Sequence, residues 1–471
     1  MEKNSEKKSQ ARELQDKLVS KRKNATLILS EDQISQADVF SDSYKKFLDD
    51  GKTEREAVTA SIMLAQANGF EEYDPQKDNK PGDKFFYVNR KKCIILTILG
   101  TEPIEKGIRI AAAHIDSPRI DLKQNPLYED DELGYFKTHY YGGIKKYQWT
   151  AIPLALHGVI FKTDGEFVEI NIGEDQEDPV FCVTDLLPHL ATEQMKKTLA
   201  DAIKGEDLNL LIGSRPFKDD DVSEKVKLNI LNILNQKYGI VEDDFVTAEL
   251  EIVPIYKARD IGFDRSLIGA YGQDDRVCAY TSLKAILDCK NPSKTVMTVL
   301  SDKEETGSDG NTGLQSAYMK YHIADIAAKF GVEGRTVLSH SECLSADVNA
   351  AMDPNFPEVT EKRNVARINY GVAVTKYTGA RGKAGTSDAS AEFVSRIRQL
   401  LNKNKVIWQT GELGKVDAGG GGTVAAYIAN LNVDVIDVGV PVLSMHAPYE
   451  ITSKIDVYMA YKAFSAFFSD K

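Results

Sequence analysis

Five segments of the sequence place histidine or acidic side chains directly after apolar, strand-like runs. In chain order, these side chains are His114, Asp116, Asp274, Asp275, Glu304, Glu305, Asp347 and His446. Active sites of open α/β sheets form beyond the carboxyl ends of the strands, so positions of this kind can share one site. Imidazole and carboxylate groups together are typical ligands of zinc, manganese and cobalt. The pattern therefore indicates a paired metal site.

In two of these segments, the spacing of the residues indicates which side chain could bind a metal and which could orient a ligand or transfer protons. His114 and Asp116 lie two residues apart on an expected strand and so point to the same side, which suits an imidazole ligand and a carboxylate that orients it. Glu304 and Glu305 are adjacent, so their side chains diverge. One carboxylate can then bind a metal while the other faces the substrate and moves protons.

The adjacent carboxylates Asp274 and Asp275 stand at a glycine-rich strand-to-helix turn, where they repel each other unless a cation or a helix N-terminus compensates. Two metal ions ~3.5–4 Å apart require a bridging carboxylate, and we predict that Asp274 is that bridge. Each segment also has a structural alternative. His114 can be a satisfied core histidine, Asp274 a helix N-cap and Asp347 a turn residue. The combination of the five segments, rather than any single one, favours the metal site.

The elements that must position these side chains follow a strand–helix alternation after Asp260. We expect strands at 295–301, 336–346, 404–409 and 433–438, and helices at 275–288, 312–330, 387–402, 423–430 and 453–469. Earlier in the chain we expect helices at 6–23, 32–49 and 54–68, a hairpin at 84–99 and a strand at 107–114. Such alternation predicts an α/β fold with a mixed central sheet flanked by helices.

Residues 127–255 differ from the rest of the chain in composition and pattern, with acidic clusters, short β-rich stretches and one helical run near 223–237. The whole chain of 471 residues is longer than a single hydrophobic core usually supports. We therefore expect one catalytic domain, made of residues 1–126 and 256–471, that is interrupted by an inserted β-rich domain at 127–255.

Composition and charge exclude several classes of function. The chain carries 71 acidic against 59 basic residues, a formal net charge of −12, whereas nucleic-acid binding rewards clustered positive charge. No run approaches the ~20 apolar residues that a membrane span needs, and the charged start lacks the apolar core of a secretory signal. The five cysteines are scattered and form no C-x-x-C pair. We expect a cytoplasmic protein that binds neither nucleic acid nor membranes.

Seven segments of the chain resemble those of the aminopeptidase I / aspartyl aminopeptidase family of dinuclear metallopeptidases, and especially its bacterial aminopeptidase I branch. In the family's order they are AHIDSPRIDLK, QDDRVCAY, SDKEETGSDG, SADVNAAMDPNF, KYTGARGKAGTSDASAEF, DAGGGGTVA and LSMHAPYE. The resemblance implies a zinc-peptidase-like catalytic domain. It also implies that the insertion is a dimerisation domain, and that the particle is a homo-oligomer, a tetrahedral dodecamer built from dimers.

The resemblance also implies a ligand set, residue by residue. His114 and Asp347 would bind one metal ion, Glu305 and His446 would bind the second, and Asp274 would bind both. The cofactor would be two divalent ions per subunit, zinc in the first place, with cobalt or manganese as alternatives.

Further roles rest on the same resemblance. Glu304 would be the general base, and Asp116 would be the carboxylate that supports the first histidine. The peptide bond between Asp274 and Asp275 would be cis. Lys376 would read an acidic first side chain of the substrate. A solvated basic loop explains Lys376 equally well, and its surroundings depart from the pattern of the aspartyl enzymes.

The activity expected from these roles is that of a metal-dependent aminopeptidase, which removes N-terminal amino acids from short peptides by a two-metal activated water with Glu304 as base. Two alternatives stay open. One is an N-acyl amino acid amidohydrolase or deacetylase of the same architecture, and the other is a catalytically inactive scaffold homologue. Peptides with free or acylated N-termini distinguish the two hydrolases.

Overall fold

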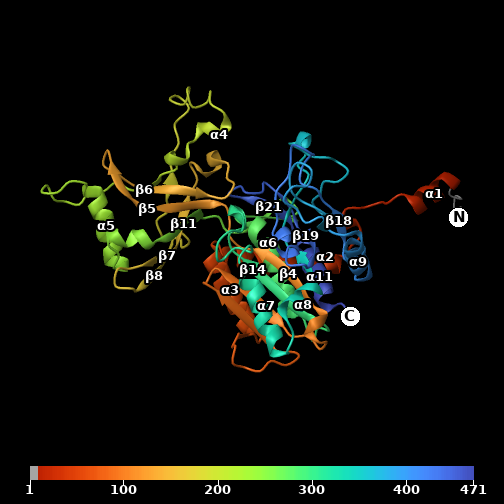
Figure 1. The fold of residues 1–471 in the computed structure, drawn as a ribbon. Coiled ribbons are helices and arrows are strands. Elements are labelled where there is room, and N and C mark those ends of the chain that lie inside the picture. The colour runs from red at the N-terminus through yellow and green to blue at the C-terminus, as the bar shows by residue number, and fades with distance from the viewer. Residues whose placement is uncertain (1–8) are drawn as a thin grey trace.

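The computed structural model describes residues 9–471, and its largest sheet is a mixed sheet of nine strands (Figure 1). In spatial order the strands are β1 Glu71–Glu72, β2 Lys84–Asn89, β3 Cys93–Ile98, β14 Thr295–Ser301, β4 Ile108–His114, β15 Glu342–Ser345, β19 Asp434–Gly439, β17 Val372–Thr375 and β18 Trp408–Thr410. The four central strands β14, β4, β15 and β19 are parallel to one another. Their carboxyl ends therefore meet at one edge, where an active site is expected.

Helices cover both faces of this sheet, as the strand–helix alternation predicts. Successive side chains of a strand point to opposite faces, and in β3 and β4 they join two separate cores. The first core is completed by α2 Glu31–Asp50, α3 Glu54–Ala67, α6 Gln273–Asp288, α9 Ala391–Lys403 and α11 Lys454–Ser469, and the second by α7 Tyr318–Lys329, α8 Gly334–Ser339 and α10 Ala425–Ala429. The predicted α/β fold is confirmed. Over residues 9–471, no helix combines the length and the apolar character needed to cross a membrane.

Several expected elements differ from the structure. The strand expected at 404–409 is β18, which begins only at Trp408. The helix expected at 312–330 begins only at Tyr318, after a turn. The strand expected at 336–346 is a short helix, α8, followed by strand β15, because the apolar pair Val337 and Leu338 packs into the core from a helical turn. The helix expected at 6–23 is α1 Gln10–Leu18, and residues 1–8 lie outside the described part of the chain.

A second sheet has seven antiparallel strands and lies to one side of the first (Figure 1). In spatial order its strands are β8 Phe167–Ile172, β7 Leu154–Phe161, β11 Glu249–Pro254, β5 Arg119–Asp130, β6 Leu133–Tyr141, β10 Leu210–Gly213 and β9 Cys182–Val183. Helix α5, Lys225–Tyr238, packs against its core, which contains the buried Trp149 and Phe245. The strands run from Arg119 to Pro254, and the division of the chain into domains at 127 and 255 stays a prediction.

A third sheet has five strands, and several predicted site residues lie in the segments that precede, follow or connect these strands. Its strands, in spatial order, are β12 Arg259–Ile261, β13 Leu267–Ala270, β21 Glu450–Ser453, β20 Pro441–Leu443 and β16 Asn349–Ala350. The shorter helical segments are α4 Leu199–Ala202, η1 Ala25–Leu27, η2 Ile104–Lys106, η3 Lys146–Trp149, η4 Gly205–Asp207, η5 Glu242–Thr247, η6 Glu304–Thr306 and η7 Pro357–Val359. Strand β13 precedes Asp274, the β20–β21 connection carries His446, and β16 follows Asp347.

A buried histidine on α7 makes the stability of the fold depend on pH. His322 is 3% exposed, and its ring stacks on Tyr87 at 4.8 Å and meets Tyr73 edge-on at 4.9 Å. Burial lowers the pKa of His322 from 6.5 to about 4. The unfolded chain then binds more protons between these values, so the stability that neutral His322 supplies is present above about pH 6.5 and is lost as the pH falls toward 4.

We expect His322→Phe to reduce this loss, because phenylalanine keeps an aromatic ring without a titrating group. Between pH 7 and pH 5, the free energy of unfolding should fall by about 2 kcal/mol less in the variant than in the wild type. Chemical denaturation of both metal-free proteins at the two pH values measures this difference. An equal loss in the two proteins would show that His322 does not sense the pH.

Candidate metal centre

Three parallel strands deliver predicted site residues to one edge of the central sheet. Strand β4 ends at His114, which is paired in register with Ser301, the last residue of β14. The turn that follows β14 carries Glu304 and Glu305 in the short helix η6. Asp347 comes two residues after the end of β15. Neighbouring parallel strands thus bring together residues that are far apart in the sequence.

The third sheet supplies the remaining predicted ligands. Asp274 lies in the first turn of α6, two residues after the left-handed N-cap residue Gly272. The Glu450 carboxylate accepts hydrogen bonds from the backbone N–H groups of Gln273 at 2.6 Å, Asp274 at 3.0 Å and His446 at 2.7 Å. Glu450 is buried and ties these two parts of the site together. Glu450 was not predicted as a site residue, because it begins a strand instead of following one, although the segment LSMHAPYE ends on it.

Two sets of three side chains converge closely enough to hold a metal ion each. The first set is His114, Asp274 and Asp347, and the second is Asp274, Glu305 and His446. In each set, the candidate ligand atoms lie within 4.8 Å of one another. Asp274 belongs to both sets, as a bridging carboxylate must.

Within these sets, imidazole nitrogens lie close to carboxylate oxygens. His114 Nε2 lies 3.6 Å from Asp347 Oδ1. His446 Nε2 lies 2.9 Å from Asp274 Oδ2 and 3.4 Å from Glu305 Oε1. The structure thus gathers all five side chains for which the sequence predicts metal binding.

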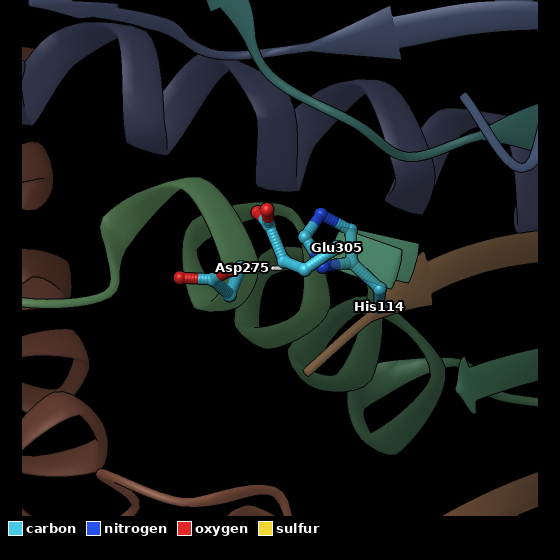
Figure 2. A group of neighbouring side chains, drawn as sticks. All are labelled: His114, Asp275 and Glu305. Atoms are coloured by element: carbon cyan, nitrogen blue, oxygen red, sulfur yellow. Dashed lines mark ion pairs between the residues drawn. The ribbon is translucent and has the colours of Figure 1, made fainter. Parts of the chain in front are cut away.

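A third set shares His114 and Glu305 with the others and adds Asp275 (Figure 2). In this set, His114 Nδ1 lies 3.7 Å from Asp275 Oδ1. However, Nδ1 also lies 3.3 Å from the Asp116 carbonyl and 3.6 Å from the Asp116 carboxylate. A histidine ligand commonly donates its second ring N–H to such an oxygen, which leaves Nε2 for the metal. The geometry therefore favours the first set, with Asp347, over the third.

Asp116 supports the turn that carries the two glutamates. Its carboxylate accepts hydrogen bonds from the backbone N–H groups of Glu304 at 3.0 Å and Glu305 at 3.2 Å, and from the Tyr141 hydroxyl at 2.7 Å. The side chain of Asp116 is fully buried. Asp116 therefore lies beside His114, as the sequence predicts, and also fixes the backbone of the η6 turn. The contact with Tyr141 was not predicted.

The site gathers buried carboxylates whose mutual repulsion a bound cation would relieve. Burial and the neighbouring acidic groups raise the pKa of Glu304 to about 8 and that of Asp275 to about 6. Burial alone lowers the pKa of His446, but the hydrogen bond to Asp274 and the charge of Glu305 raise it to about 11. Among the described atoms, Glu305 Oε1 and both Asp275 carboxylate oxygens are buried without a hydrogen-bond partner. Crowded carboxylates of this kind fit a site that holds divalent ions.

Lys376 stands apart from these sets. Its ammonium contacts Asp388 Oδ1 at 2.6 Å, and Lys383 binds the other oxygen of the same carboxylate at 2.7 Å. The Lys376 side chain is half exposed, in a loop between β17 and α9. Its substrate-binding role stays a prediction.

The prediction of a cis peptide bond between Asp274 and Asp275 is wrong. No peptide bond of residues 9–471 is cis. Both residues belong to the first turn of helix α6, and the backbone of an α-helix is built from trans peptides.

Comparisons with known proteins agree with this geometry. The family model described as "Aminopeptidase I zinc metalloprotease (M18)" matches residues 47–468. A curated relative from Clostridium acetobutylicum, "Probable M18 family aminopeptidase 1", is 51% identical over 96% of this chain and 99% of its own. The crystal structure of an M18 aminopeptidase from Thermotoga maritima superposes with a TM-score of 0.91 and 44% identity, over 96% of this chain and 100% of the other. The S. cerevisiae mApe1 dodecamer has the same fold, with a TM-score of 0.75 and 21% identity, over 93% and 97% of the two chains.

Proposed function

The chain belongs to the aminopeptidase I zinc metalloprotease family (M18) and is a metal-dependent aminopeptidase, and we propose that the two sets of side chains that share Asp274 hold two divalent ions. The observation that carries this proposal is the shared carboxylate, because a bridging acid is the feature that distinguishes a two-metal site from two separate sites. The proposed ions are zinc, with cobalt or manganese as functional substitutes, since nitrogen and oxygen ligands suit all three.

Bound ions would supply Lewis-acid activation of a water molecule and of the scissile carbonyl. The protein supplies the proton transfers. Glu304 lies outside both donor sets, its backbone N–H is held by Asp116, and its carboxylate is close enough to His114 and Asp347 for their charges to act on it. We assign Glu304 the role of general base, which accepts a proton from the attacking water and then passes it to the leaving amine.

Restriction to N-termini would follow from the charge of the site. A protonated α-amino group is attracted to carboxylates such as Asp274 and Glu305, and a neutral one could bind an ion that they hold. An acylated N-terminus offers neither. The proposed substrates are therefore short peptides with a free N-terminus, and the assignment of Lys376 to the first side chain belongs to this proposal.

The proposed assembly is a cytoplasmic homo-oligomer, a tetrahedral dodecamer in which the β-rich segment 127–255 joins the subunits in pairs. Two observations support it. The fold is shared with the S. cerevisiae mApe1 dodecamer, and the seven-stranded sheet extends to one side of the central sheet (Figure 1).

We expect a chelator to lower the rate of hydrolysis of aminoacyl p-nitroanilides by at least about 100-fold, because both donor sets lose their ions. Zinc, cobalt or manganese added to the chelated protein should restore the rate. The assay should compare Asp, Glu, Leu, Lys and Ala substrates, each with a free and an acetylated N-terminus. Full activity in a metal-free preparation would refute the two-metal site, and release of acetate from the acetylated substrates, measured in parallel, would favour an amidohydrolase.

A further inference from the structure

The end of strand β6 reaches from the seven-stranded sheet into the metal centre. Here the chain reads Tyr141-Gly142-Gly143, a segment that we call the 141–143 strap. The Tyr141 hydroxyl donates to Asp116 Oδ2 at 2.7 Å. Two residues later, the Gly143 carbonyl oxygen lies 3.0 Å from Nδ1 of His446. The strap therefore contacts both the carboxylate beside the first donor set and the histidine of the second.

The contact with Gly143 selects one tautomer of His446. A carbonyl oxygen only accepts hydrogen bonds, so Nδ1 must carry the proton in this contact. The other ring nitrogen, Nε2, then faces Asp274 and Glu305. A histidine held in this way presents a single nitrogen toward the ion position, with its ring orientation already set.

The two glycines of the strap avoid tight contacts with the second donor set. Gly142 has φ +71°, and a Cβ there would lie 3.0 Å from Glu305 Oε2 and 3.2 Å from Glu305 Cβ. At Gly143, a Cβ would lie 3.2 Å from Nδ1 of His446. A side chain at either position would therefore press on a residue of the second donor set.

The tyrosine of the strap is held by residues of its own sheet. The Arg119 guanidinium lies 3.9 Å from the centre of the Tyr141 ring. Arg119 in turn pairs with Asp121 at 2.8 Å and with Glu251 at 3.1 Å. Asp121 lies on β5 and Glu251 on β11, so the position of the Tyr141 hydroxyl is tied to three strands of the seven-stranded sheet.

We propose that the 141–143 strap is a positioning element of the metal centre. Tyr141 holds Asp116, and through it the turn of Glu304 and Glu305, while the Gly143 carbonyl orients His446. The seven-stranded sheet would then control the geometry of the reaction as well as any contact between subunits. This inference rests on the proposed two-metal function.

Three variants of the full-length protein test the proposal. Tyr141→Phe removes one hydroxyl and keeps the ring beside Arg119. Gly143→Ala adds one methyl group against His446. The control is Tyr140→Phe, since Tyr140 is on the same strand but is 41% exposed, with its ring near Gly205.

Zinc affinity, measured by competition titration of the metal-free proteins, and kcat and KM of the zinc-loaded proteins are the readouts. We expect Gly143→Ala to weaken binding of one of the two zinc ions by about 10–100-fold. Tyr141→Phe should lower kcat by about 10–100-fold and change KM by less than about threefold, because it loosens the glutamate turn and leaves substrate binding intact. Tyr140→Phe should match the wild type in all three quantities.

Wild-type zinc affinity and kcat in both Tyr141→Phe and Gly143→Ala would overturn the proposal. If Gly143→Ala fails to fold, as circular dichroism would show, Tyr141→Phe decides the outcome by its kcat. A wild-type protein that binds fewer than two zinc ions would instead refute the proposed two-metal function, so the two failures are distinguishable.

Discussion

Glu304→Gln is expected to lower kcat by about 10²–10⁴-fold while the protein still binds two zinc ions. The amide has the size of the carboxylate and can make hydrogen bonds, but it cannot accept a proton from the attacking water. Metal binding should persist because Glu304 belongs to neither donor set. The Asp116 hydrogen bonds to the turn involve backbone N–H groups, which the substitution leaves in place.

The measurement pairs steady-state kinetics on an aminoacyl p-nitroanilide with the zinc content per subunit. Glu358→Gln is the matched control, since Glu358 is exposed on the short helix η7 and belongs to none of the donor sets. An unchanged kcat would refute the assignment of Glu304 as the base. Loss of zinc from Glu304→Gln would identify Glu304 as a ligand instead.

Asp274→Asn is expected to reduce the zinc content from two ions per subunit to less than one and to abolish measurable turnover, a loss of more than about 10³-fold. Asp274 is the one side chain that belongs to both proposed sets, so a neutral amide in its place weakens both ion positions at once. The substitution would also remove the Asp274 carboxylate that lies 2.9 Å from Nε2 of His446.

Two matched variants distinguish loss of the bridging ligand from loss of a ligand to a single ion. Asp347→Asn alters the first set alone and should cost one ion, whereas Asp275→Asn alters only the third set and should leave both ions bound. Zinc content is measured on each protein after removal of free metal, with circular dichroism as a check of folding. Retention of two ions by Asp274→Asn would rule out the bridge, and loss of an ion from Asp275→Asn would revive the set with Asp275.

Much of the fold could be predicted from local patterns. Strand β14 was expected at 295–301 and is found there, and the helices expected at 54–68 and 453–469 lie within one residue of α3 and α11. Their apolar periodicity is a local property, so it survives in the structure. The segment 336–346 was misread because a two-residue apolar run such as Val337-Leu338 fits a strand or a helical turn equally well.

The contacts that organise the site could not be predicted from the sequence to the same extent. Asp116 was predicted to support His114 because the two are neighbours in sequence, yet its bonds to the turn of Glu304 span nearly 190 residues. The hydrogen bond from His446 to Gly143 spans 303 residues. Nothing in a glycine pair at the end of a strand signals that its carbonyl orients a distant histidine.

The sequence by itself identified the candidate side chains for the chemistry: His114, Asp274, Glu304, Glu305, Asp347 and His446 are recognisable by type and by their places after apolar strands. That recognition is possible because ligand and proton-transfer chemistry belongs to the side chain itself. Asp274 was already predicted as the bridge, and the structure places it in two sets. Only the tertiary structure decided that Glu450 and the 141–143 strap hold these sets in place and that the Asp274–Asp275 peptide is trans. The physical reason is that distances between residues far apart in the chain arise from the packing of three sheets, which no local pattern encodes.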